Sequence, residues 1–163
     1  MFYLSLLGVL SLVVYMAMAI WKHGVPEMVS STYYQGGGIW FSVVMWIVSL
    51  SLMVPMLDSG IGIQAFAFLC GASMLFVGSA PNFLDEFEMP IHKGAAIISA
   101  IACIGWCLSA NWIPTVIIVP SYAVYLLVVY IIRKKNKDYN CHTWLIAELL
   151  AFADTFITYW SLL

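Results

Sequence analysis

Residues 112–132, WIPTVIIVPSYAVYLLVVYII, contain no charged side chain over 21 positions. A helix needs about 20 consecutive apolar residues to cross a bilayer, and irregular backbone is excluded there because its polar groups would be unpaired. The whole chain has the same character, with 64% hydrophobic residues, 9% charged residues and a mean hydropathy of +0.99. Soluble domains carry about 25% charged residues. The sequence therefore predicts an integral membrane protein.

Five further runs are apolar and long enough to be read in the same way. Together the six expected transmembrane helices cover residues 3–21, 39–57, 61–80, 95–111, 112–132 and 144–163. The first run lacks the cationic start of a signal peptide, so we interpret it as a spanning helix. Six helices and short loops use nearly the whole chain. We expect an all-α, compact six-helix bundle, with residues 1–163 as one domain and no extramembrane domain.

The cations predict an orientation. Six helices would place both termini on one face and loops 22–38, 81–94 and 133–143 on the other. All six cationic residues fall in or directly beside these three loops: Lys22, Lys93, Arg133, Lys134, Lys135 and Lys137. Short loops rich in Lys and Arg are retained in the cytoplasm. We therefore expect a plasma (inner) membrane protein with cytoplasmic loops and both termini outside.

The loop between the third and fourth runs belongs to the stretch PNFLDEFEMPIHKGAA, residues 81–96. Its prolines suggest that one helix ends at Pro81 and that the next begins after Pro90, with His92 in its first turn. Four polar side chains then form a candidate mouth of a pocket at the cytoplasmic edge: Asp85, Glu86, Glu88 and His92. The alternative is a solvated loop.

The loop after the first run, WKHGVPEMVSSTYYQGGG, is rich in hydroxyl groups and poor in charge. Ser31 and Tyr34 are candidates for hydrogen bonds to a polar ligand or a lipid headgroup. A plain interfacial loop is the alternative interpretation. The sequence does not show whether this loop touches the loop of residues 81–94.

Three histidines are expected at one depth of the membrane: His23, His92 and His142. With nearby carboxylates they are candidate ligands for zinc, which takes four N, O or S ligands. None of them belongs to an HxxxH or HExxH pair, and lone histidines at membrane edges are usually interfacial. Zinc is therefore an alternative, and otherwise no cofactor is expected.

The sixth run separates into two faces at 100° per residue. Small and polar residues share one face: Ala147, Glu148, Ala151, Asp154, Thr155, Thr158 and Ser161. The other face is bulky and suits lipid. A carboxylate inside a membrane costs about 2.5–3.5 kcal/mol, so Asp154 and Glu148 are candidates for a functional role. The alternative is a neutral carboxylic acid that is hydrogen-bonded across a helix interface.

Small residues recur every four positions in the fourth run, at Ala95, Ser99, Cys103 and Cys107. This spacing lets transmembrane helices approach closely, and it predicts helix packing. The same face is a candidate contact for a homo-oligomer.

The segments VPEMVSSTYY (25–34) and HKGAA (92–96) resemble six-helix DRAM/Sfk-type membrane proteins and related uncharacterised bacterial membrane domains. That resemblance implies a lipid-related function, with Ser31 and His92 at the matching positions. A fainter resemblance is to CREST-type membrane hydrolases, which bind zinc through three histidines and an aspartate. Those proteins have seven helices and a paired HxxxH, whereas this chain has six expected helices and no such pair.

These observations favour a protein that binds or handles a lipid or a small amphipathic molecule without catalysing a reaction. Membrane lipids are the expected partners, and no nucleic acid is expected. One alternative is a membrane-embedded, metal-dependent hydrolase. The other is a proton- or cation-coupled transporter or channel that acts as an oligomer and uses Asp154 and Glu148.

Overall fold

The computed structural model describes residues 1–35, 38–80, 85–136 and 141–163, the side chains of Asp85 and Glu86 excepted. Every regular element in this part of the chain is a helix. In chain order they are α1 (Phe2–His23), the 3-10 helix η1 (Ser30–Gln35), α2 (Gly38–Ser59), α3 (Gln64–Ser79), α4 (Asp85–Ala110), α5 (Trp112–Lys135) and α6 (Thr143–Trp160). The expected all-helical class is confirmed.

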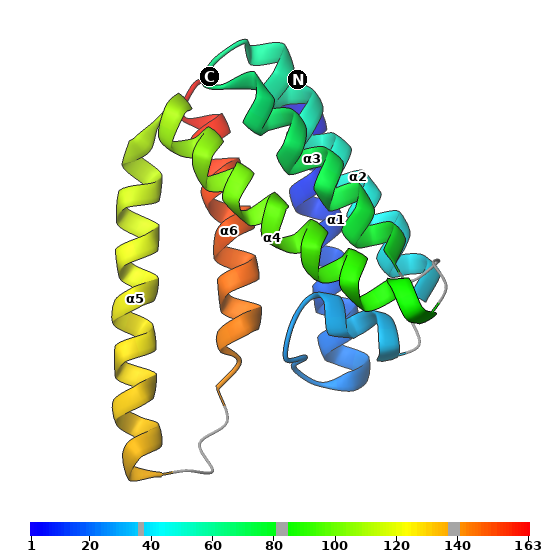
Figure 1. The fold of residues 1–163 in the computed structure, drawn as a ribbon, viewed down its shortest axis with the longest axis vertical. Helices are drawn as coiled ribbons and strands as arrows, with labels where there is room; N and C mark the ends of the chain where they lie inside the picture. Colours follow the sequence, from blue (N-terminus) through cyan, green and yellow to red (C-terminus); the bar gives the residue numbers. More distant parts are fainter. Residues whose placement is uncertain (36–37, 81–84, 137–140) are drawn as a thin grey trace.

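The six α-helices run up and down, so that both chain ends lie at one end of the molecule (Figure 1). The last turns of α1, α3 and α5 and the first turns of α2, α4 and α6 lie at the opposite end, which we call the loop end. Of the described cations, Lys22 lies in the last turn of α1, and Arg133, Lys134 and Lys135 lie in the last turn of α5. Lys93 lies in the third turn of α4. Lys137, also predicted at the loop end, lies outside the described residues.

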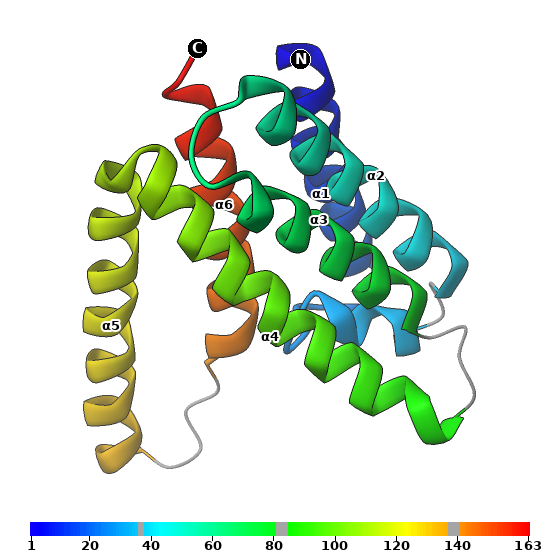
Figure 2. The same ribbon diagram turned by 45° about the horizontal axis from the view of Figure 1, so that its top comes forward.

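Helices α1, α2, α3 and α4 pack one against the next, and α2 lies between α1 and α3 (Figure 2). Two glycines allow these close contacts. A Cβ on Gly8 of α1 would lie 2.6 Å from the Cβ of Ser51 in α2, and a Cβ on Gly71 of α3 would lie 2.3 Å from the Cβ of Met53. Small residues bring membrane helices together in this way.

Helix α5 stands apart from α1, α2 and α3 in both ribbon views. Only Pro114, Thr115 and Val129 are buried along its length. Near its start Asn111 Nδ2 donates to Ser161 Oγ at 2.7 Å, and in its middle Tyr122 Oη donates to the Thr143 carbonyl at 2.9 Å. The rest of its apolar surface is open.

Four helices are long and apolar enough to cross a membrane: α1, α2, residues 87–110 of α4, and α5. Helix α3 is apolar but has only 16 residues. Helix α6 has 18 residues and carries both Glu148 and Asp154. The structure thus supports membrane residence through four strong candidate spans.

The predicted start of the fourth helix was wrong. We expected the helix to begin just after Pro90 and its apolar run to begin at residue 95, but α4 begins at Asp85 and continues through Pro90. A proline removes one backbone hydrogen bond, and in the second turn of a long helix this loss does not stop the chain from being helical. Most of the expected loop 81–94 is therefore helix, and His92 lies two turns inside it. Residues 81–84 lie outside the described part.

Candidate functional site

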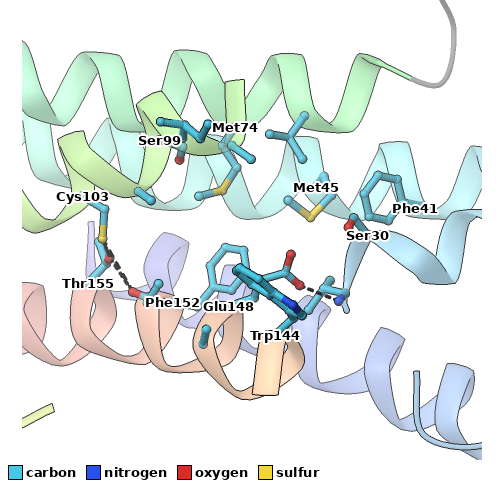
Figure 3. Close-up of a pocket in the computed structure, with 17 residues that line it drawn as sticks. Ser30, Phe41, Met45, Met74, Ser99, Cys103, Trp144, Glu148, Phe152 and Thr155 are labelled. Atoms are coloured by element: carbon cyan, nitrogen blue, oxygen red, sulfur yellow. Dashed lines mark hydrogen bonds between the residues drawn. The ribbon is translucent and has the colours of Figure 1, made fainter. Parts of the chain in front are cut away.

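A cavity of about 330 Å³ lies between α2, α3, α4 and α6 (Figure 3). Its wall is almost entirely apolar. Large side chains form most of it, among them Phe41, Met45, Met74, Val77, Ile97 and Phe152. Its volume is at the small end of the range of about 300–1,000 Å³ for small-molecule pockets. The cavity suits a single apolar chain or a compact amphiphile.

Helix α6 contributes small side chains to the wall, namely Ala147, Ala151 and Thr155. The cavity extends from Trp144 to Thr155, which corresponds to about 16 Å along the helix axis. At the Thr155 end, the side chain of Cys103 is in hydrogen-bond contact with the Thr155 hydroxyl. The polar groups of this end therefore already have partners.

Glu148 provides the carboxyl group of the cavity, near the loop end. Its Oε2 accepts a hydrogen bond of 2.6 Å from the backbone nitrogen of Val29, which belongs to the segment between α1 and η1. The same segment is joined to α6 a second time, because the nitrogen of Leu145 donates to the carbonyl of Glu27 at 3.0 Å. We call residues 27–30 the strap. Glu148 holds the strap over one end of the cavity, where Val29 and Ser30 form part of the wall.

The prediction that the bulky face of α6 meets lipid was wrong for most of its length. Leu145 and Phe156 are 5% and 3% exposed, and Trp160 Nε1 donates to Ser5 Oγ of α1. Ile157 is exposed as expected. The reason is the position of α6, which contacts α1, α2, α4 and α5 and so meets protein on nearly all sides.

Asp154 is buried but does not belong to the cavity wall. It lies beside the hydroxyls of Thr115 in α5 and Thr158 in α6. None of the atoms Asp154 Oδ1, Thr115 Oγ1 and Thr158 Oγ1 has a hydrogen bond of good geometry. The structure therefore separates the two carboxylates of α6: Glu148 lies at the cavity, and Asp154 lies at the junction with α5.

Tyr34 and Glu88 join the segment after α1 to α4. Tyr34 Oη donates to Glu88 Oε1 at 2.5 Å, and this bond raises the pKa of Tyr34 to about 12 because it stabilises the protonated phenol. The two loop-end segments thus touch, which the sequence did not show. Ser31 has a local role, because its hydroxyl donates to the Met28 carbonyl at 2.8 Å.

His92 is half-buried on α4 and lies near Glu88 and the backbone of Val77. His23 ends α1, and His142 precedes α6. In the described ranges, no group of three or more His, Cys, Asp or Glu side chains is placed to hold a metal ion. The structure therefore does not bring the three histidines together. Asp85 and Glu86 lie in the first turn of α4, and their side chains are outside the described part.

The small-residue face of α4 packs inside the chain. Ser99 Oγ donates to the Cys70 carbonyl of α3 at 3.2 Å, and Cys103 meets α6. Ala95, Ser99, Cys103 and Cys107 are each less than 10% exposed. An oligomer stays a prediction, but these side chains are already buried within one chain.

Sequence reasoning missed that Met45, Met74, Ser99 and Cys103 line a cavity. The repeat of small residues on α4 was a usable signal, since a small side chain either allows close packing or leaves a space. Met45 and Met74 gave no local signal, because they meet only when α2 and α3 pack together.

A scan against protein-family models and searches of curated proteins and of solved structures found no match. The resemblance to DRAM/Sfk-type proteins and the fainter one to CREST-type hydrolases stay predictions.

Proposed function

We propose that this chain is a six-helix membrane protein whose cavity holds the apolar part of a lipid or of a small amphipathic molecule. The observation that carries the proposal is the combination of an apolar cavity of about 330 Å³ with one carboxylate, Glu148, near its loop end. Ligand pockets are mostly apolar and contain a few polar groups that fix orientation. The protein binds or presents this molecule without covalent chemistry.

The proposed membrane arrangement uses all six helices. Helix α3 is short but packs against α2 and α4, and α6 carries carboxylates but contacts α1, α2, α4 and α5. The described cations of α1 and α5 lie at the loop end. By the rule for cationic loops this end is cytoplasmic, and both chain ends are outside a plasma (inner) membrane.

The ligand has a hydrogen-bond donor at its polar end. A carboxylate only accepts hydrogen bonds, and one Glu148 oxygen is already engaged with Val29. A hydroxyl or an ammonium group on a single alkyl chain meets this requirement.

A filling substitution tests the proposal. Ala151→Phe puts a ring into the cavity, while Ala123→Phe adds the same ring on the open surface of α5. We expect native mass spectrometry of gently purified protein to show one bound amphiphile on the wild type and on Ala123→Phe, and its loss from Ala151→Phe. Equal retention by all three proteins would refute binding in this cavity.

Asp154 supports a second candidate function, a proton- or cation-coupled transporter. It is 3% exposed, and its Oδ1 has no hydrogen-bond partner. Buried carboxylates of this kind mark ion pathways in membranes. Asp154→Asn would abolish ion-coupled uptake into vesicles if this function is correct, and Asp58→Asn would not. Metal-dependent hydrolysis is not proposed, because the described His, Cys, Asp and Glu residues do not form a ligand group.

A further inference from the structure

A second hollow, a groove of about 620 Å³, lies between α1, η1 and α2. It shares no lining residue with the cavity described above. Most of its wall is apolar and open to the surroundings, with Leu10, Val14 and Met18 from α1 and Trp40 from α2, each at least half exposed. In a membrane protein such a surface faces lipid.

One cation, Lys22, and the imidazole of His23 line one end of this groove. Lys22 and His23 are the last two residues of α1. The distance from Leu10 to Lys22 corresponds to 12 residues of helix, or about 18 Å. One leaflet of bilayer hydrocarbon is about 15 Å thick. The groove thus extends along one leaflet and ends in positive charge at the depth of the headgroups.

The polar groups on the floor of the groove differ in their hydrogen bonding. Tyr15 Oη and Thr32 Oγ1 are hydrogen-bonded to each other at 2.7 Å, and Thr32 Oγ1 also donates to the Val29 carbonyl. Gln35 Oε1, in contrast, is buried and has no hydrogen-bond partner. A buried acceptor without a partner costs about 1–3 kcal/mol, so a donor from a bound molecule would remove this cost.

We propose that the groove binds one anionic glycerophospholipid with a hydroxylated headgroup, taken from the leaflet at the loop end. An acyl chain lies along Leu10, Val14 and Met18, the phosphate lies between Lys22 and His23, and a headgroup hydroxyl donates to Gln35 Oε1. Anionic lipids are abundant in the cytoplasmic leaflet, and each nearby Lys or Arg contributes about 1 kcal/mol of attraction. This inference rests on the proposed membrane location but not on ligand binding in the cavity.

The test compares lipid retention between charge variants. Wild-type protein is exposed in nanodiscs to equal amounts of phosphatidylglycerol, phosphatidylcholine and phosphatidic acid with identical acyl chains, and the lipids that remain bound are counted by native mass spectrometry. We expect phosphatidylglycerol to be preferred. Lys22→Gln should reduce its retention about five-fold, as expected for one lost cation, and the double variant Lys22→Gln/His23→Gln should reduce it further.

The matched control removes one positive charge elsewhere at the same end, as Lys134→Gln. It should leave the preference unchanged, whereas an equal loss in Lys22→Gln and in Lys134→Gln would show general electrostatic attraction and overturn the proposal. Gln35→Leu should cancel the preference for phosphatidylglycerol over phosphatidic acid, whose headgroup has no alcohol hydroxyl.

Two uncharged variants distinguish lipid binding in this groove from lipid binding in the cavity. Val14→Trp, which blocks the proposed acyl path, should reduce retention of all three lipids, and it replaces the charge variants as the test if these do not fold. Ala151→Phe should leave the phosphatidylglycerol preference unchanged. If Ala151→Phe removes that preference and Val14→Trp does not, the lipid lies in the cavity and the groove proposal is wrong.

Discussion

Helices α2 and α5 have nearly the same hydropathy but very different surroundings. Their apolar 18-residue spans have mean hydropathies of 2.0 and 2.3, yet 56% of the α2 span and only 11% of the α5 span is buried. Helix α2 contains the buried serines Ser42, Ser49 and Ser51, whereas α5 is rich in exposed Val and Ile. Hydropathy therefore indicates which segments belong in a membrane, and small residues indicate which of them form the centre of the bundle.

The largest difference between α2 and α5 is expected when a leucine on each helix is shortened to alanine and the free energies of unfolding are compared. Leu52 of α2 is 2% exposed, and Leu127 of α5 is 58% exposed. Leu52→Ala should lower the free energy of unfolding by about 2–4 kcal/mol, because it leaves an unfilled space in a packed region. Leu127→Ala should change it by less than about 0.5 kcal/mol. Unfolding in mixed micelles measures both values, and similar losses would mean that α5 is packed as tightly as α2.

Two glycines should respond in opposite directions to the same change. Gly8→Ala places a Cβ 2.6 Å from the Cβ of Ser51 and should cost about 1–3 kcal/mol through overpacking. Gly94 of α4 has no atom within 4 Å of the added Cβ, so Gly94→Ala should stabilise the helix by up to about 1 kcal/mol. Thermal melting of both variants measures these two changes in stability. A stabilising Gly8→Ala would contradict the close contact of α1 and α2.

Asp154 of α6 lies beside Thr115 of α5, and we expect this contact to contribute to the attachment of α5. A double-mutant cycle with Asp154→Ala and Thr115→Val should give a coupling energy of about 0.6–1.7 kcal/mol, the range found for polar contacts between membrane helices. Pairing Asp154→Ala with Thr143→Val, at the far end of α6, should give no coupling. Zero coupling in both cycles would show that Asp154 does not hold α5.

The smallest effect is expected for Tyr34→Phe, which removes the hydrogen bond to Glu88 from an exposed side chain. The loss should be at most about 1 kcal/mol. Because folding raises the pKa of Tyr34 from 10.0 to about 12, the stabilisation is fully present below pH 10 and is lost as the pH rises through 12. Melting of wild type and variant at several alkaline pH values should therefore converge, and a constant difference would argue against this bond.

The sequence predicts the six α-helices because each is a long run with few charges. It fails at the start of α4, where Pro90 resembles a boundary but lies inside the helix. It also fails for the bulky face of α6, since composition does not show how many neighbours a helix has. Asp154 and Glu148 can be selected from the sequence, because carboxylates are rare in such an apolar chain. The cavity beside Glu148 cannot be predicted in this way, because Met45 and Met74 come together only when α2 and α3 pack in the bundle.

The strap has a consequence for how the protein is made. The hydrogen bond from Val29 to Glu148 joins residues 119 positions apart. At a synthesis rate of about 5–20 residues per second, Glu148 is synthesised roughly 6–24 s after Val29. During that time the newly inserted α1 and α2 have no α6 beside them. Completion of the loop end is therefore a late event in biogenesis, set by the arrival of the last helix.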